Sequence, residues 1–155
     1  MTVVESKLVE LGYALPPPPE PIGNYVPARR SGSIMWMSGV GSRRADGSRI
    51  SGKLGTNLTV EQGYEAARCC ALNLLSRMKV ELGDLDRVAG ILKVVGMVNS
   101  SADFEEQAKV ADGASDLFVE LFGEAGRHSR SAPGMAVLPR DTAVIVDCVI
   151  EIANP

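Results

Sequence analysis

The stretch AVIVDCVIEI, residues 143–152, decides the fold of this chain because its side chains alternate in character. One set of alternate residues is wholly apolar and comprises Val144, Val146, Cys148, Ile150 and Ile152. The other set includes two carboxylates, Asp147 and Glu151. Successive side chains of a strand point to opposite faces of its sheet, so the pattern predicts a strand with one buried face. The other face meets water or lines a polar surface.

Three other stretches predict strands of the same sheet. Residues 33–39 form an apolar run bounded by glycines, and residues 135–138 follow a basic turn. Residues 88–98 are dense in apolar and β-branched side chains, which favours a strand buried on both faces. Asp46-Gly47 lies in a polar turn after the first of these strands and predicts a hairpin.

Cap signals and apolar stripes predict two long helices. The first begins at Thr59, which has the spacing of a capping box with Gln62, and it ends at Gly83. Its apolar stripe consists of Val60, Tyr64, Ala67, Ala71, Leu74 and Met78. The second opens with an acidic cap at Asp103 and a glutamate three residues later, and it ends at Gly123.

The N-terminal segment differs in character from the rest of the chain. Residues 1–12 predict a short helix, and residues 15–21 form a stiff proline-rich strap that carries the chain across a surface. We therefore divide the chain into this segment, residues 1–21, and one domain, residues 22–155.

The order of the elements predicts an α+β fold in which both helices cover one face of a single mixed sheet. The opposite face of that sheet still needs cover. Because the last strands carry apolar residues, we expect a partner subunit to supply it, which predicts a homo-oligomer.

The composition is typical of a soluble globular protein and excludes several classes of function. The 155 residues, 45% apolar and 23% charged, fit one domain with a substantial core. A net charge of −3 and a pI near 5.2 give no electrostatic reason to expect a nucleic-acid partner. Without an apolar run of membrane-helix length or a signal-peptide pattern, we expect no membrane partner and a cytoplasmic location.

The cysteines and the single histidine predict neither a disulfide nor a metal site. Cys69, Cys70 and Cys148 show no CxxC or Cys/His spacing, and we expect all three to be small buried apolar residues. One histidine excludes a multi-histidine metal site within one chain. We expect no cofactor.

The basic turn RHSRSAPG, residues 127–134, is the candidate binding element. An arginine fork matches a carboxylate or phosphate in two hydrogen bonds, and a histidine titrates near neutrality and can act as an acid or base. Charge alone favours an ordinary basic loop, solvated or capping the helix before it, over a binding site.

Several short features together resemble the YjgF/Rid family, the reactive intermediate deaminases often labelled endoribonuclease L-PSP. Tyr25 follows Gly23-Asn24, Ser38-Gly39 ends the first strand, and Arg130-Ser131 begins eight residues before Leu138-Pro139. The stretches GRHSRSA, residues 126–132, and ADGASDL, residues 111–117, are similar to the YjgF/chorismate mutase-like subgroup. The resemblance covers roughly residues 22–153.

The resemblance implies a chorismate mutase-like fold, a homotrimer and clefts between subunits that bind small 2-imino acids or their enamine tautomers. The arginine that holds the substrate carboxylate in the deaminase branch matches Arg130. A tyrosine and a serine of the pocket match Tyr25 and Ser38, and we add Ser131 as a further substrate-binding candidate. A trimer salt bridge for Arg130, a core position for Tyr25 and a strand-end role for Ser38 are the alternatives.

The sequence departs from the deaminase branch at two positions. The glutamate that positions the attacking water is replaced by Ile145, and the cysteine two residues after the arginine by Ala132. Asp147 lies on the same strand face as Ile145, displaced by about 6–7 Å, and is a catalytic candidate together with Arg130 and His128. A hydrogen-bonded turn role for His128 and a solvated face for Asp147 are the alternatives.

Two functions remain open at this point. One is hydrolysis of an imine or enamine bound by its carboxylate to Arg130, and the other is a non-catalytic trimer that binds a carboxylate metabolite. The low pI and the small number of aromatic residues argue against the ribonuclease activity in the family label.

Overall fold

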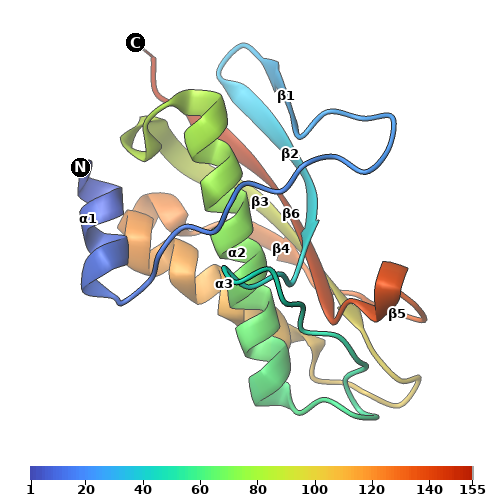
Figure 1. Ribbon diagram of the computed structural model, residues 1–155. Helices are drawn as coiled ribbons and strands as arrows, with labels where there is room; N and C mark the ends of the chain where they lie inside the picture. The colour runs from blue at the N-terminus through green and yellow to red at the C-terminus, as the bar shows by residue number, and fades with distance from the viewer. Residues whose placement is uncertain (155) are drawn as a thin grey trace.

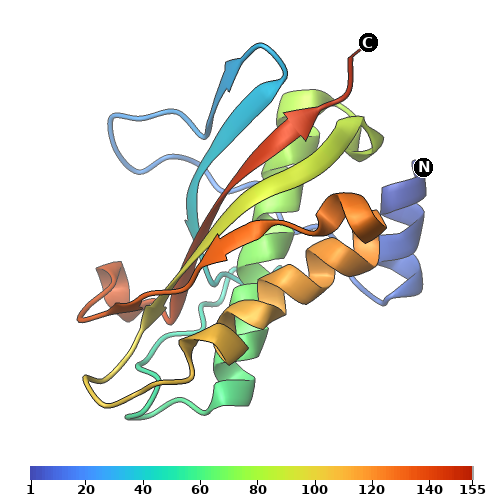
Figure 2. The same cartoon turned by 180° about the vertical axis from the view of Figure 1, so that it is seen from behind.

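The computed structural model describes residues 1–154 as a six-stranded mixed sheet with its helices on one side (Figures 1 and 2). Pro155, the last residue of the predicted domain, lies outside the described residues. The strands are β1 (Ala28–Ser31), β2 (Ile34–Gly41), β3 (Val88–Asn99), β4 (Ser129–Ser131), β5 (Gly134–Met135) and β6 (Val144–Ile152). Their order is β1-β2-β6-β3-β4, and β5 pairs with β3. The α+β class and the single mixed sheet are confirmed.

The central strand β6 shows the alternation that the sequence predicts. The five apolar residues of one set are all buried, whereas Ile145, Asp147 and Val149 are half-buried and Glu151 is exposed. Both neighbours of β6, β2 and β3, pair with it in the antiparallel sense. We call the side of the sheet that carries Ile145, Asp147 and Val149 the open face.

The helices α2 (Val60–Leu82) and α3 (Gln107–Phe122) pack against the other side of the sheet (Figure 1). The capping box of α2 is confirmed: Thr59 accepts from the Gln62 N–H, and the Gln62 side chain accepts from the Thr59 N–H. Gly83 ends α2 with a left-handed φ of 79°, which glycine adopts without steric cost. Phe118, Leu74 and Ile150 are fully buried between the helices and the sheet. Each such side chain contributes about 1.5–3 kcal/mol on burial.

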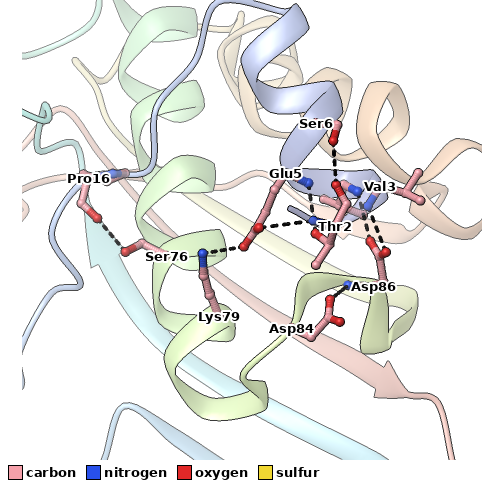
Figure 3. A network of polar contacts seen from close by, with 10 residues as sticks. Thr2, Val3, Glu5, Ser6, Pro16, Ser76, Lys79, Asp84 and Asp86 are labelled. Carbon is pink, nitrogen blue, oxygen red and sulfur yellow. Dashed lines mark hydrogen bonds and ion pairs between the residues drawn. The ribbon is translucent and has the colours of Figure 1, made fainter.

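The N-terminal segment is fixed to the domain by polar contacts (Figure 3). It begins with the predicted helix, α1 (Val3–Glu10). The Asp86 carboxylate accepts from the backbone N–H groups of Val3 and Val4, both at 2.9 Å. Lys79 pairs with Glu5 at 2.5 Å, and the Ser76 hydroxyl donates to the Pro16 carbonyl at 2.6 Å. The segment is therefore packed along α2 and not a free extension.

Three predictions about individual elements are wrong. β3 is buried on one face only, because Ala89 and Leu92 are exposed. The predicted strand at 135–138 is reduced to β5, because a 3₁₀ turn, η3 (Pro139–Asp141), follows closely. α3 begins at Gln107 and not at Asp103, whose carboxylate accepts from the Ser101 hydroxyl. Within residues 1–154, no side chain caps the start of α3.

Two strands were not predicted, β1 and β4. β1 (ARRS) and β4 (SRS) are short and polar, so they lack the apolar alternation by which a strand is recognised. β1 is an edge strand beside β2, and β4 runs parallel to β3. The hairpin at Asp46-Gly47 is a tight turn closed by one antiparallel bridge between Arg43 and Arg49.

The three cysteines are free thiols. Cys70 and Cys148 are buried as predicted, and burial raises the pKa of both thiols. Cys69 is only half-buried, which corrects its prediction as a core residue, and burial also raises its pKa. No helix within residues 1–154 combines the length and the apolar character that crossing a membrane requires.

Candidate functional site

A cavity of about 360 Å³ lies beside the edge of β2, beyond the last residue pair that β2 makes with β1. Its wall is built from the strap before β1, the β2 edge, one side of α2 and the turn before β6. Tyr25, Ser38 and Ile145 all line it, so three positions that the sequence analysis considered for a pocket meet in one chain.

Short backbone contacts position Tyr25 and Ser38 at this cavity. The Ser38 hydroxyl donates to the Val26 carbonyl at 2.6 Å, and the Ser38 N–H donates to the Pro27 carbonyl at 2.9 Å. The Tyr25 hydroxyl accepts from the Ile22 N–H at 3.3 Å. Because the Ser38 hydroxyl has used its only hydrogen, its oxygen is left to accept a hydrogen bond from a bound molecule.

Three arginines line the same cavity without a carboxylate partner. Arg43, Arg49 and Arg140 take part in none of the ion pairs found within residues 1–154. Arg43 and Arg49 stand opposite each other across the bridge that closes the hairpin. The cavity is therefore strongly cationic in a chain whose net charge is −3, and unpaired guanidinium groups favour an anionic ligand.

A fourth arginine on the wall, Arg77, is neutralised. It pairs with Glu81 at 2.6 Å and with Glu20 at 3.5 Å. Glu20 is also the one carboxylate among the described residues that line the cavity. The wall consequently has no acidic side chain free to orient a water molecule.

The backbone at Arg140 is held in a left-handed conformation that costs a non-glycine residue about 1–2 kcal/mol. Its φ is 58° and its ψ 27°, and the next residue, Asp141, has a φ of 55°. The Asp141 carbonyl accepts from the Gly52 N–H at 2.8 Å, and its carboxylate accepts from the Asn99 amide at 3.0 Å. These bonds maintain the strained turn that brings Arg140 to the cavity. Strain of this kind concentrates at binding sites.

Arg130, the predicted carboxylate anchor, does not line this cavity. Its guanidinium donates to Asp112 at 2.7 Å, to the Ser115 hydroxyl at 3.1 Å and to the Ala108 carbonyl at 3.3 Å, all on α3. Arg130 pairs in register with the buried Val94, so it lies on the helix side of the sheet. A ligand-binding role for Arg130 therefore requires its guanidinium to exchange Asp112 for the ligand.

The remaining predicted residues occupy two other places. Asp147 and Ser131 both flank Val95 on the open face, where Ser131 accepts from Lys93 at 3.2 Å. Partial burial raises the pKa of the Asp147 carboxyl, against a smaller opposing effect of Lys93. His128 lies beside α3 with Arg130 and away from the cavity.

The arginines of the cavity were not singled out in the sequence. Arg43 and Arg49 belong to a hairpin that reads as an ordinary polar turn, and Arg140 follows Leu138-Pro139 in the stretch used only to recognise the family. Nothing in local pattern relates positions so far apart along the chain. One signal in the sequence was Asp141, which follows Pro139-Arg140. Aspartate tolerates the left-handed backbone conformation in turns, so this stretch could have been predicted as a tight turn.

Comparisons with known proteins agree with the fold. Residues 5–152 match the family model described as "YjgF/chorismate mutase-like, putative endoribonuclease", so the match includes most of α1, which the sequence analysis left outside the resemblance. Protein TCP17 of Trypanosoma cruzi is 46% identical over 152 residues, which cover 97% of this chain and 95% of TCP17.

Two crystal structures are similar along almost the whole chain. Atu1372 of Agrobacterium tumefaciens, a protein of unknown function, has a TM-score of 0.90 and 38% identity and covers 98% of this chain and 93% of its own. A protein of Shewanella oneidensis described as a putative endoribonuclease has a TM-score of 0.93 and 37% identity, with 97% and 100% covered.

Proposed function

The chain belongs to the YjgF/chorismate mutase-like family, and on that premise we propose that its cavity binds a small metabolite through a carboxylate. The observation that carries the proposal is the meeting of three unpaired arginines with Tyr25 and Ser38. The volume of about 360 Å³ lies within the range of small-molecule sites.

The wall also defines the rest of the ligand. Arginine forks suit a carboxylate, and the Ser38 oxygen suits an N–H or O–H donor on the ligand. Ile145, Val40 and Leu74 provide an apolar surface for a short carbon chain. A small 2-amino, 2-imino or 2-hydroxy acid has these three features together.

Binding without hydrolysis fits the wall better than deamination does. At position 145, where the resemblance implies a glutamate to orient water, isoleucine has no acceptor. The Glu20 carboxylate is already paired with Arg77. Asp147 is the remaining candidate for a general base, because its pKa is raised, but it does not line the cavity. We therefore favour a non-catalytic binding protein over a deaminase.

The proposal includes the homotrimer that the resemblance implies. Trp36, 47% exposed, pairs in register with the half-buried Val149, so two apolar side chains lie side by side on the open face of the sheet. Exposed apolar surface of this kind marks contact sites between proteins. Association through this face would place Asp147 near the subunit interface.

Calorimetric titration of the purified protein with pyruvate, 2-hydroxybutanoate and L-serine tests the proposal. We expect binding of at least one of these probes, weakened about 10-fold or more by Arg43→Ala or Arg140→Ala, because a hydrogen bond to a charged group is worth about 1.5–3 kcal/mol. Arg127→Ala, which removes an exposed arginine outside the cavity, is the matched control and should bind normally.

Two results would contradict the proposal. If binding survives both cavity substitutions but is lost in Arg130→Ala, then Arg130 of the basic turn, and not the arginines of the cavity, binds the ligand carboxylate. Accelerated ammonia release from 2-iminopropanoate by the wild-type protein, abolished in Asp147→Asn, would replace simple binding with hydrolysis.

A further inference from the structure

A serine and a histidine outside the cavity are joined in the manner of a nucleophile and its base. His128 Nε2 lies 2.8 Å from the Ser115 hydroxyl of α3, and His128 Nδ1 lies 2.7 Å from the Gly126 carbonyl oxygen. The Phe118 ring and the imidazole form a T-shaped pair with a centroid distance of 6.1 Å and an interplanar angle of 89°. The imidazole is therefore held on three sides.

The partner of Nδ1 determines the tautomer. A carbonyl oxygen only accepts, so Nδ1 must carry the hydrogen that bonds Gly126. In the neutral ring Nε2 is then an acceptor, and the Ser115 hydroxyl donates to it. A hydroxyl that donates to an imidazole oriented by a third group is the arrangement that activates a serine nucleophile.

The surroundings of the pair keep His128 unprotonated, which is the state that can accept a proton. Burial lowers the pKa of His128, against the opposing effect of the hydrogen bond to Gly126 and with a small contribution from the positive charge of Arg130, so the ring is the free base at neutral pH. Arg130 also donates to the Ser115 oxygen at 3.1 Å while it is held by Asp112 at 2.7 Å. A cation at that distance stabilises the negative charge that develops on the oxygen. Ser115 and His128 are both half-buried, which leaves each partly accessible to solvent.

We propose that Ser115 is a nucleophile with His128 as its general base, and that it reacts with small activated acyl esters. The Ser115 oxygen forms a bond to the acyl carbon, and its proton passes to His128 Nε2. The bond from the acyl carbon to the leaving alkoxide breaks as His128 returns the proton to that group. Water, deprotonated in turn by His128, then hydrolyses the acyl-serine and restores both residues. This activity does not depend on the cavity.

A fluorophosphonate probe tests the nucleophile directly. The serine oxygen displaces fluoride from phosphorus and gives a stable adduct, which intact-mass measurement counts and peptide mapping locates. We expect one adduct per chain on Ser115 of the wild-type protein, and slow release of p-nitrophenol from p-nitrophenyl acetate. Ser115→Ala should abolish both reactions.

Two further variants keep the outcome decisive. His128→Asn retains an amide that can donate to Gly126 but removes the base, so it should slow labelling about 100-fold or more. Ser129→Ala removes an exposed hydroxyl that donates only to the Leu92 carbonyl, and it should leave labelling unchanged. An unlabelled wild-type chain, an adduct mapped elsewhere, or equal labelling of His128→Asn would overturn the proposal whatever the stability of Ser115→Ala.

Discussion

His128, Arg130 and Arg127 are near neighbours along the chain, yet each lies in a different environment. The Arg127 side chain is 67% exposed, and its guanidinium lies 3.9 Å from the Glu124 carboxylate. A surface ion pair this long contributes little to stability. Arg130 is 22% exposed and fastens β4 to α3 through Asp112. His128 is half-buried between Ser115 and Gly126. At the scale of residues, the basic turn is therefore not a single cationic patch: His128 and Arg130 contact α3, whereas Arg127 is exposed.

His128 should make the stability of the protein depend on pH near neutrality. The pKa of His128 is lowered in the folded chain, whereas in the unfolded chain it is near 6.5. The unfolded state therefore binds the proton more readily. The contribution of neutral His128 is fully present above about pH 6.5 and is lost as the pH falls below that value, through the lower pKa of the folded chain.

Urea denaturation between pH 5 and 7.5 measures this dependence. Because His128 is the single histidine of the chain, His128→Asn should flatten the loss of unfolding free energy between pH 7 and pH 5.5. Identical pH profiles for the variant and the wild type would show that His128 titrates alike in both states.

At the scale of elements, the two long helices pack at very close range because of one glycine. A Cβ added at Gly113 of α3 would lie 1.9 Å from the Tyr64 carbonyl oxygen of α2 and 2.8 Å from its carbonyl carbon. Both atoms belong to backbone and cannot move aside as a side chain would. The crossing of α2 and α3 therefore requires glycine at this position.

Gly113→Ala should destabilise the protein by about 3 kcal/mol, the upper part of the usual range for overpacking, even though alanine favours the helix by about 1 kcal/mol. Thermal or urea unfolding measures the loss. Gly90→Ala is the matched control, since its added Cβ would approach no atom closer than the Ala125 carbonyl at 3.5 Å. Equal stability of the two variants would mean that the helices separate at little cost.

At the scale of the whole molecule, the sheet is covered on one face only (Figure 2). The helices bury every second side chain of β6, starting from Val144, whereas Ile145 and Val149 on the open face remain half-buried. Trp36 of β2 lies beside Val149 and is 47% exposed. Partly exposed apolar side chains on one face of an otherwise covered sheet are what a subunit interface would bury.

In the trimer that we propose, Trp36 lies at the interface, so Trp36→Glu should shift the protein toward the monomer, because the added charge would be desolvated without a partner. Size-exclusion chromatography with light scattering measures the mass. Val80→Glu, which changes a 55% exposed valine on α2, is the control and should remain trimeric. As Trp36 is the single tryptophan, its fluorescence should move to longer wavelength when the wild type dissociates on dilution. A monomeric wild type at micromolar concentration would contradict the proposed assembly.

Long apolar patterns were predictable from the sequence, because burial of a helix stripe or a strand face is a property of neighbouring residues. The alternation of β6, the Thr59 cap and the Gly83 and Gly123 ends all follow from such local rules. Asp103 does not cap α3, which begins at Gln107, and its carboxylate accepts from the Ser101 hydroxyl. β1 and β4 were missed because they are polar and short, and they exist through pairing with β2 and β3.

The sequence by itself determined the three long strands β2, β3 and β6, the two covering helices and the family, because each depends on residues adjacent in the chain or at fixed spacing. Only the tertiary structure decided which arginines are free. Arg130 is held by Asp112, whereas Arg43 and Arg49 share the cavity with Arg140, almost a hundred residues away in the chain. The sequence gives the number of charges, but distance in space sets which partner neutralises each one, because Coulomb attraction weakens with distance and with the dielectric constant of the surroundings.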